Sequence, residues 1–170
     1  LIESVQAQTY KNFQLCLADG SDNEKVGTYI RENYKEDSRI CYRLLEKNDG
    51  ISENTNRAIE LAEGDFIMFS DHDDTLAPNA LYEIVKEINE NPGTDVVYTD
   101  EDKVTMDGKR YFDPHFKPDF NLDMLRCNNY ICHIFVVKRE ILEQVGMLRK
   151  EYDGAQDYDF ILRCCEQARN

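Results

Sequence analysis

Acidic residues directly follow a short apolar run near the middle of the chain. The run Phe66–Phe69 leads through a serine into Asp71, Asp73 and Asp74. An apolar run of this length, bounded by turn residues, is typical of a buried strand. Carboxylates crowded at a strand end repel one another unless a cation lies between them, and Mg²⁺ and Mn²⁺ prefer oxygen ligands. The sequence therefore predicts a divalent-metal site able to bridge phosphates, with a solvated acidic turn as the alternative.

A second acidic turn follows an earlier apolar run. Residues 13–18 alternate and then become apolar, and Asp19 begins the Asp-Gly-Ser turn that ends this run. Ligands of open α/β sheets bind at the carboxyl ends of the strands, so both acidic turns are expected to face one crevice. There Asp19 can accept hydrogen bonds from a base or a ribose, and a role in the turn alone is the alternative.

Strand-like and helical segments alternate through most of the chain. This alternation predicts an α/β fold with a mostly parallel central sheet and helices on both faces. Ser52 is expected to cap a helix, residues 106–109 to form a hairpin turn, and 111–120, with two prolines, to be an ordered loop. Strands are expected at 13–18, 40–45, 66–69, 95–99 and 134–137, and helices at 26–34, 52–62, 78–90, 139–145 and after 154–159.

Composition bounds the class of protein. The 170 residues suit a single domain, and 41% hydrophobic with 32% charged residues is the balance of a globular protein. No apolar run approaches the roughly 18 residues of a membrane span. A net charge of −14 argues against a nucleic-acid partner, because such partners require basic surfaces, but it leaves room for a nucleotide bound through a metal.

The six cysteines and the first residue lead to two further predictions. None of the cysteines forms a C-x-x-C pair, so a zinc or redox site is not expected. Cys127, Cys132 and His133 are a less favoured set of metal ligands. Leu1 is not a natural start, so residues are expected to be missing before it.

Several motifs occur in an order that matches a known family. The chain resembles the family 2 glycosyltransferases of GT-A fold, and its later motifs resemble the bacterial, rhamnosyltransferase-like branch that builds surface polysaccharides. The resemblance extends over nearly the whole chain. The family begins with a strand before its first helix, so the resemblance implies an N-terminally truncated domain that lacks the first strand. The motifs lie at 4–13, 19–21, 62–67, 71–74, 77–81, 98–103, 116–119, 129–133 and 154–159.

The resemblance implies roles in binding a sugar-nucleotide donor. Asp19 matches the acid that contacts the donor base, and Gly50 lies in the loop that borders the nucleotide. Asp71 and Asp73 match the D-x-D motif. Asp73 would bind a divalent metal, Mn²⁺ or Mg²⁺, while Asp71 would serve the ribose or the metal's outer shell. Asp74 would be a supporting group.

The resemblance also implies a catalytic base and an acceptor region. Asp157 matches the acid that deprotonates the acceptor hydroxyl, and Gln156 stands where glutamate is usual. His133 would line the acceptor site or approach the metal. Packing is the alternative role of His133, and capping of the last helix is the alternative role of Asp157. Residues 1–102 would form the nucleotide-sugar-binding part and 103–170 the acceptor-binding part of one domain.

The implied activity is metal-dependent sugar transfer with inversion. The donor would be a UDP-, dTDP- or GDP-linked sugar, and the acceptor a glycan or lipid-linked glycan, with no nucleic-acid partner. The family suggests a cytoplasmic location at the inner face of the membrane, with peripheral membrane association. The sequence leaves open which sugar, nucleotide and acceptor are used, as well as the oligomeric state.

Two other functions remain open from the sequence. Asp71 and Asp73 also satisfy the D-x-D-x-T motif of haloacid-dehalogenase-type phosphatases, where Asp71 would be the nucleophile and Asp73 an acid/base group. Two expected strands precede this motif, whereas phosphatases of this type carry it on the first strand. The second alternative is a truncated, inactive domain that binds sugar nucleotides.

Overall fold

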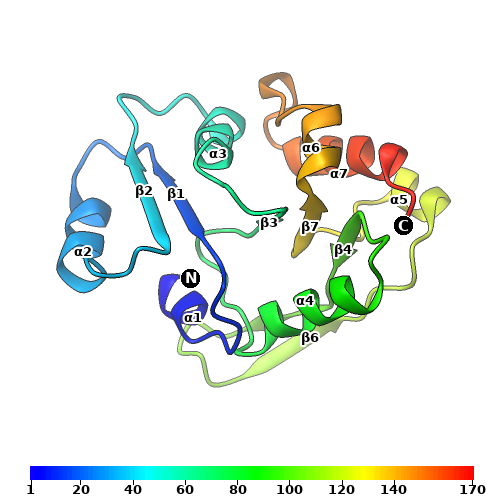
Figure 1. The fold of residues 1–170 in the computed structure, drawn as a ribbon, viewed down its shortest axis with the longest axis horizontal. Helices are drawn as coiled ribbons and strands as arrows, with labels where there is room; N and C mark the ends of the chain where they lie inside the picture. Colours follow the sequence, from blue (N-terminus) through cyan, green and yellow to red (C-terminus); the bar gives the residue numbers. More distant parts are fainter.

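Fifteen helical and strand segments make up the structure, a computed structural model that describes residues 1–170 (Figure 1). None of its helices is both long and apolar enough to cross a membrane. The segments are α1 (Ile2–Gln6), β1 (Leu15–Asp19), α2 (Lys25–Asn33), β2 (Ile40–Leu44), α3 (Ile51–Ile59), β3 (Phe66–Phe69), α4 (Ala80–Glu90), β4 (Val96–Tyr98), β5 (Glu101–Val104), β6 (Tyr111–His115), α5 (Leu122–Cys127), β7 (Phe135–Lys138), α6 (Arg139–Val145), the 3₁₀ helix η1 (Lys150–Tyr152) and α7 (Gln156–Gln167).

The strands form one parallel pair, one three-stranded antiparallel sheet and one hairpin. β1 pairs with β2 in parallel, with Cys16 opposite Cys41. β7 lies between β3 and β4 and is antiparallel to both of them. The predicted α/β class is confirmed, but the sheet is more mixed than the predicted, mostly parallel one.

The antiparallel strand β7 has a topological cause. The β3–α4–β4 connection returns the chain in the direction of β3 but leaves space for one strand between β3 and β4. β7 enters that space after the β5–β6 hairpin, the short helix α5 and the irregular residues 128–134, and it runs opposite to β3 and β4. Its residues Phe135, Val136 and Val137 are 2% exposed or less, because strands cover both edges and helices cover the faces.

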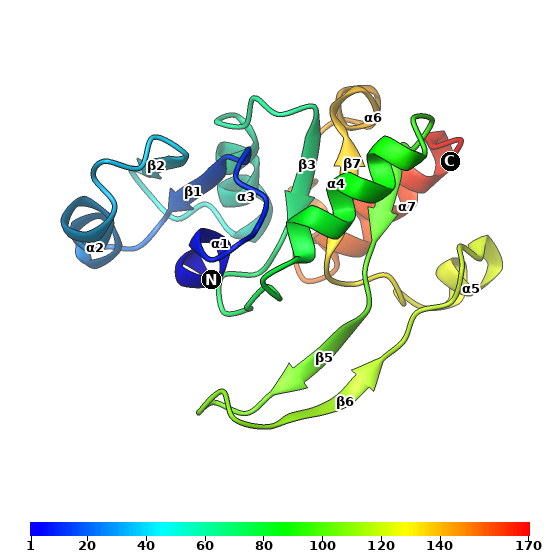
Figure 2. The same cartoon turned by 60° about the horizontal axis from the view of Figure 1, so that its bottom comes forward.

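Helices cover both faces of the sheet, as predicted. α1 and α4 lie on one side, and α3, α6 and α7 lie on the other (Figures 1 and 2). One core cluster of 13 buried residues spans both parts of the chain, from Ile59 and Ile67 to Phe160, Ile161 and Cys164. The parts 1–102 and 103–170 therefore share one hydrophobic core.

The β5–β6 hairpin extends away from the rest of the molecule (Figure 2). The turn between its strands matches the predicted turn at 106–109, but β6 occupies the first half of the segment 111–120, where a loop was expected. Pro114 did not prevent strand formation, because β6 pairs only with β5 and the pairing is irregular near Glu101 and Lys103. An edge strand tolerates a residue without an N–H group.

Candidate active site

Three ligating side chains converge just beyond the end of β3. Ligand atoms of Asp71, Asp74 and His133 all lie within 4.8 Å of one another. His133 Nε2 is 3.4 Å from Asp71 Oδ2. β3 ends directly before the acidic turn, and His133 comes from the irregular segment that leads into the neighbouring strand β7. Two carboxylates and one imidazole at this spacing are a donor set that fits Mn²⁺.

The electrostatics of this group favour a bound cation. Burial raises the pKa of the Asp74 carboxyl above its ordinary value, and the charges of Asp71, Asp73 and Glu101 act in the same direction. The neighbouring His133 lowers the pKa of Asp74 and so acts in the opposite direction. Mutual repulsion of this kind is relieved when a divalent ion shares the site. Asp73 contributes to this field, but it is not one of the three residues whose ligand atoms converge.

The segment that carries His133 also contacts Asp157. Asn129 Nδ2 donates to Asp157 Oδ2 at 3.1 Å, while Asn129 Oδ1 accepts from the backbone N–H of Cys132 at 3.2 Å. Asp157 lies in the first turn of α7, and the ring of Phe160 packs 5.1 Å from that of Phe69 at the end of β3. These contacts place the expected base on the same side of the molecule as the acidic turn.

Asp157 does not cap its own helix. The N-cap position of α7 is Ala155, and no side chain caps the helix there. Gln156 Oε1 instead accepts from the backbone N–H of Gly154 at 2.7 Å and closes the turn before the helix. Asp157 therefore has one carboxylate oxygen bound to Asn129 and is otherwise available for chemistry.

Asp19 is held at the end of β1 by two hydrogen bonds. Its Oδ1 accepts from the backbone N–H of Ser21 at 2.9 Å, and its Oδ2 accepts from the Tyr42 hydroxyl at 2.8 Å. Burial acts against ionisation of Asp19, but these hydrogen bonds outweigh it and lower the pKa of the carboxyl. Burial and the hydrogen bond to Asp19 raise the pKa of Tyr42 to about 12. Asp19 is therefore a charged acceptor at this strand end.

Gly50, expected to border the nucleotide, lies against Asp153 in the segment before α7. Its φ of +101° is in the left-handed region, and a Cβ there would lie 2.7 Å from Asp153 Oδ2. Asp153 Oδ1 in turn accepts from the Ser52 backbone N–H at 3.2 Å and from the Ser52 hydroxyl at 2.5 Å. The expected role of Ser52 was wrong, since Gly50 is the N-cap residue and Asp153 satisfies the first turn of α3.

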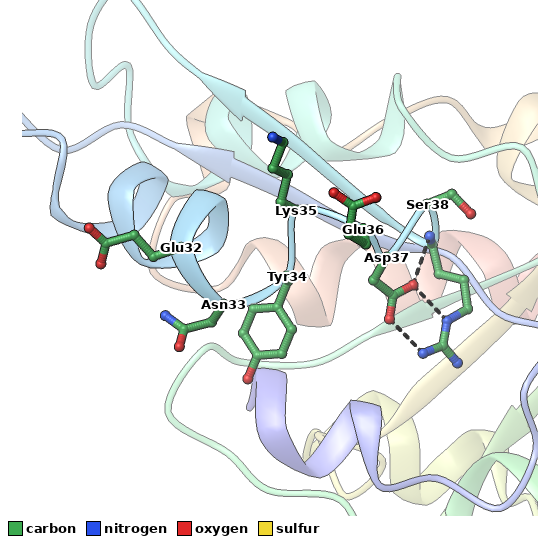
Figure 3. A pocket seen from close by; sticks show the side chains of 8 residues that line it. Glu32, Asn33, Tyr34, Lys35, Glu36, Asp37 and Ser38 are labelled. Atoms are coloured by element: carbon green, nitrogen blue, oxygen red, sulfur yellow. Dashed lines mark hydrogen bonds and ion pairs between the residues drawn. The ribbon is translucent and has the colours of Figure 1, made fainter.

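A surface pocket lies elsewhere. It is formed by the continuous segment from Glu32 to Arg39, where Asp37 accepts two hydrogen bonds from the Arg39 guanidinium (Figure 3). This segment precedes β2, whereas Asp19 is the last residue of the parallel strand β1. The pocket is therefore at the opposite end of the strand pair from Asp19 and contains none of the predicted site residues.

Residues 1–146 match the family described as glycosyl transferase family 2. The chain belongs to that family. This family 2 domain is 37% identical over 166 residues to the O-antigen biosynthesis protein RfbC of Myxococcus xanthus, covering 97% of this chain and 13% of RfbC. It also spans only 19% of a relative from Sinorhizobium fredii that is 44% identical to it.

Solved structures confirm the GT-A fold predicted for this family 2 domain. S. aureus TarS in complex with UDP has a TM-score of 0.71 at 21% identity, covering 94% of this chain and 48% of that one. The mannosyltransferase PcManGT from Pyrobaculum calidifontis, in complex with GDP-Man and Mn²⁺, has a TM-score of 0.69 at 17% identity, covering 98% and 47%. Family membership also favours a glycosyltransferase over the phosphatase alternative.

The structure adds site residues to which sequence reasoning gave no role. Asn129 bonds to Asp157, and Asp153 binds the first turn of α3 from 101 positions away. Lys117 donates hydrogen bonds to the backbone carbonyls of Ile131 and His133. Asn129 and Lys117 lie in motifs of the family resemblance, and these motifs could have drawn attention to both residues. Nothing in the sequence pairs Asp153 with Ser52.

Proposed function

We propose that this family 2 domain transfers a sugar, with inversion, from a nucleotide-sugar donor to a hydroxyl group of a glycan or lipid-linked acceptor. One observation carries the proposal. Ligand atoms of Asp71, Asp74 and His133 converge within 4.8 Å of one another, and Asn129 bonds both to Asp157 and to the backbone N–H of Cys132, the residue before His133. This link between the two groups supports a common site for a diphosphate and for a base that acts on an acceptor.

Different residues of the chain would bind the metal and accept the proton. Asp71, Asp74 and His133 would hold Mn²⁺ or Mg²⁺, which when bound stabilises the negative charge of the leaving diphosphate. Asp157 accepts the proton of the acceptor hydroxyl as that oxygen forms its bond to the anomeric carbon. The bond from that carbon to the diphosphate breaks, and the diphosphate leaves with the electron pair. A single displacement of this kind inverts the configuration of the anomeric carbon.

The donor-side residues would bind the nucleoside. Asp19 presents a charged carboxylate at the end of β1, and Gly50 lets the chain turn closely beside Asp153. Asp73 would contribute charge next to the ligand group rather than a direct metal bond. The complexes of similar structures with UDP and with GDP-Man support a nucleoside-diphosphate donor, with dTDP as a third candidate.

We assign the product to bacterial surface polysaccharide. The support is the similarity to an O-antigen biosynthesis protein, together with more distant similarity to chondroitin synthases. Residues 103–170, which include Asp157 and His133, would form the acceptor side, and the domain would work at the inner face of the membrane. The rhamnosyltransferase-like branch makes a dTDP-linked deoxysugar one donor to test.

Calorimetric titration with UDP, dTDP and GDP, each with and without Mn²⁺, tests the donor site. We expect one nucleotide to bind at least tenfold more tightly with Mn²⁺, because its phosphates complete the coordination of the metal. Asp71→Asn should abolish this metal dependence, whereas Asp73→Asn should reduce affinity less. Binding that is independent of Mn²⁺ for every nucleotide would contradict the proposed metal site.

Turnover distinguishes an enzyme from an inactive binding domain. Release of free nucleotide is measured with dTDP-, UDP- and GDP-linked sugars and an oligosaccharide acceptor. Metal-dependent nucleotide binding without acceptor-dependent release for any donor would favour the inactive, sugar-nucleotide-binding alternative.

A further inference from the structure

Lys117 is a buried lysine whose three N–H donors are all used. Its side chain is 1% exposed, although it follows the exposed hairpin strand β6. Nζ donates to Glu101 Oε2 at 2.9 Å, to the backbone carbonyl of Ile131 at 2.5 Å and to the backbone carbonyl of His133. An ammonium group has three donors, so no further partner is needed. Burial acts against ionisation of Glu101, but Lys117 outweighs it and lowers the pKa of Glu101.

The two carbonyl groups belong to the segment that delivers His133 to the ligand group. Residues 128–134 form neither a helix nor a strand, and Cys132 has a φ of +44°. The carbonyls of this segment therefore lack the partners that regular secondary structure provides. Lys117 bonds to two of them, one of which belongs to His133 itself.

Different contacts hold the middle of the segment 128–134 in the core and restrain the backbone of His133. Tyr130 and Ile131 are fully buried, so hydrophobic packing already holds the middle of the segment in the core. His133 is the part that reaches out of the core toward Asp71, and its side chain is 31% exposed. This imidazole is only partly packed, and the hydrogen bond from Lys117 restrains the backbone from which it projects.

We propose that Lys117 is a positioning residue for the divalent-cation site, acting through the backbone of the ligand His133. This inference rests on the proposed function. Lys117 does not contact the cation or the substrate in this proposal. It holds the carbonyl groups on both sides of Cys132 and thereby sets the distance between the His133 imidazole and the two carboxylates.

Mn²⁺ affinity tests the proposal, measured by electron paramagnetic resonance of free Mn²⁺ in the presence of UDP, dTDP or GDP. Lys117→Met should raise the Mn²⁺ Kd about 10- to 100-fold, the range found when groups that orient metal ligands are removed. The matched control is Lys103→Met, because Lys103 lies on the neighbouring strand β5 and pairs with Asp113 at the surface. The control should leave the Mn²⁺ Kd unchanged.

A double-mutant cycle shows whether Lys117 acts through His133. If it does, Lys117→Met should have no further effect on the Mn²⁺ Kd in a His133→Ala background. An equal loss in both backgrounds would overturn the proposal, since a general structural defect would act with or without the imidazole. An unchanged Kd in Lys117→Met alone would also overturn it.

A second variant covers the case in which Lys117→Met does not fold. Lys117→Gln has a shorter side chain with two N–H groups, so it cannot reach all three acceptors, and its Mn²⁺ Kd should rise several-fold. An unchanged Kd in this variant would overturn the role of Lys117. Failure of the proposed function would give a different result, because the wild-type chain would then bind no Mn²⁺ with any nucleotide. That result would also overturn the role of Lys117.

Discussion

The strand pair β1–β2 and the sheet β3–β7–β4 are packed very differently. Every residue of β1 is partly exposed, and Leu44 at the end of β2 is 46% exposed. In β7, by contrast, Val137 is fully buried, and the core cluster of 13 residues contains no residue of β1 or β2. The two parts of the candidate site therefore rest on supports of different strength.

The difference matches how each part of the site is held. On the donor side, Asp19 is fixed by Ser21, two positions away, and by Tyr42 on the paired strand. On the catalytic side, Asp71 meets His133 and Asn129 meets Asp157, across contacts between distant segments. A few hydrogen bonds therefore hold Asp19, the proposed nucleoside contact, whereas the converging ligand group lies next to strands of the packed core.

The largest effect should come from the catalytic side. Asp157→Asn removes the proposed base and should lower kcat by about 10²- to 10⁴-fold, while nucleotide affinity stays within about threefold. Steady-state kinetics and nucleotide titration on the same preparations measure the two quantities. Glu151→Gln is the control, because Glu151 is an exposed acid in the preceding helix η1. A kcat close to that of the wild type would assign the base to another residue.

Core truncation should separate the two regions by stability. Phe160 is 2% exposed and packs against Phe69 and Phe135, so Phe160→Ala should cost about 3–5 kcal/mol of unfolding free energy. Leu17 in β1 is only partly buried, and Leu17→Ala should cost about 1–2 kcal/mol. Urea denaturation measures both. Equal costs would show that the strand pair is as firmly packed as the main core.

Two aspartate–arginine pairs extend the comparison to electrostatics. Asp159 is 8% exposed between Arg149 and Arg163, so Asp159→Asn should cost about 2–3 kcal/mol. Asp37 is 20% exposed and pairs with Arg39 two positions away, so Asp37→Asn should cost about 1 kcal/mol. Chemical denaturation at pH 7 tests this order, and the opposite order would contradict the comparison.

The Asp159 pair also predicts a pH dependence. Burial acts against ionisation of Asp159, but its arginine partners outweigh it and lower the native pKa below the ordinary value of 3.8. Its contribution to stability is therefore complete above pH 3.8 and is lost as the pH falls through the native pKa. The stability difference between wild type and Asp159→Asn should shrink on acidification below about pH 4. A constant difference would contradict this linkage.

The smallest difference between two paired variants should occur where Gly50 meets Asp153. Gly50→Ala adds a left-handed alanine and a methyl group against Asp153, and should cost about 2 kcal/mol and weaken nucleotide binding. Gly108 is the matched control, because its φ is +70° and nothing lies within 4 Å of the added Cβ. Gly108→Ala should cost about 1 kcal/mol and leave binding unchanged. If both substitutions had equal effects on stability and binding, the contact with Asp153 would not explain why position 50 is glycine.

Local patterns predicted most elements of the fold. The run Phe66–Phe69 forms a strand that ends at the acidic turn, and the strands and helices of the first hundred residues lie close to their expected positions. Hydrophobic periodicity and turn residues reflect interactions between residues close in sequence, so they indicate helices and strands without knowledge of the fold. The segment 111–120 was misjudged because a proline excludes a central strand but not an edge strand such as β6.

The amino-acid sequence by itself determined the family, the α/β class and the set of acidic residues at the strand ends. Only the tertiary structure decided which of them converge, because Asp74 and not Asp73 joins Asp71 and His133. Spacing along a turn identifies neighbouring carboxylates but not their directions. Their convergence with His133 needs a later segment of the chain, whose Tyr130 and Ile131 lie in the core and whose backbone accepts hydrogen bonds from Lys117.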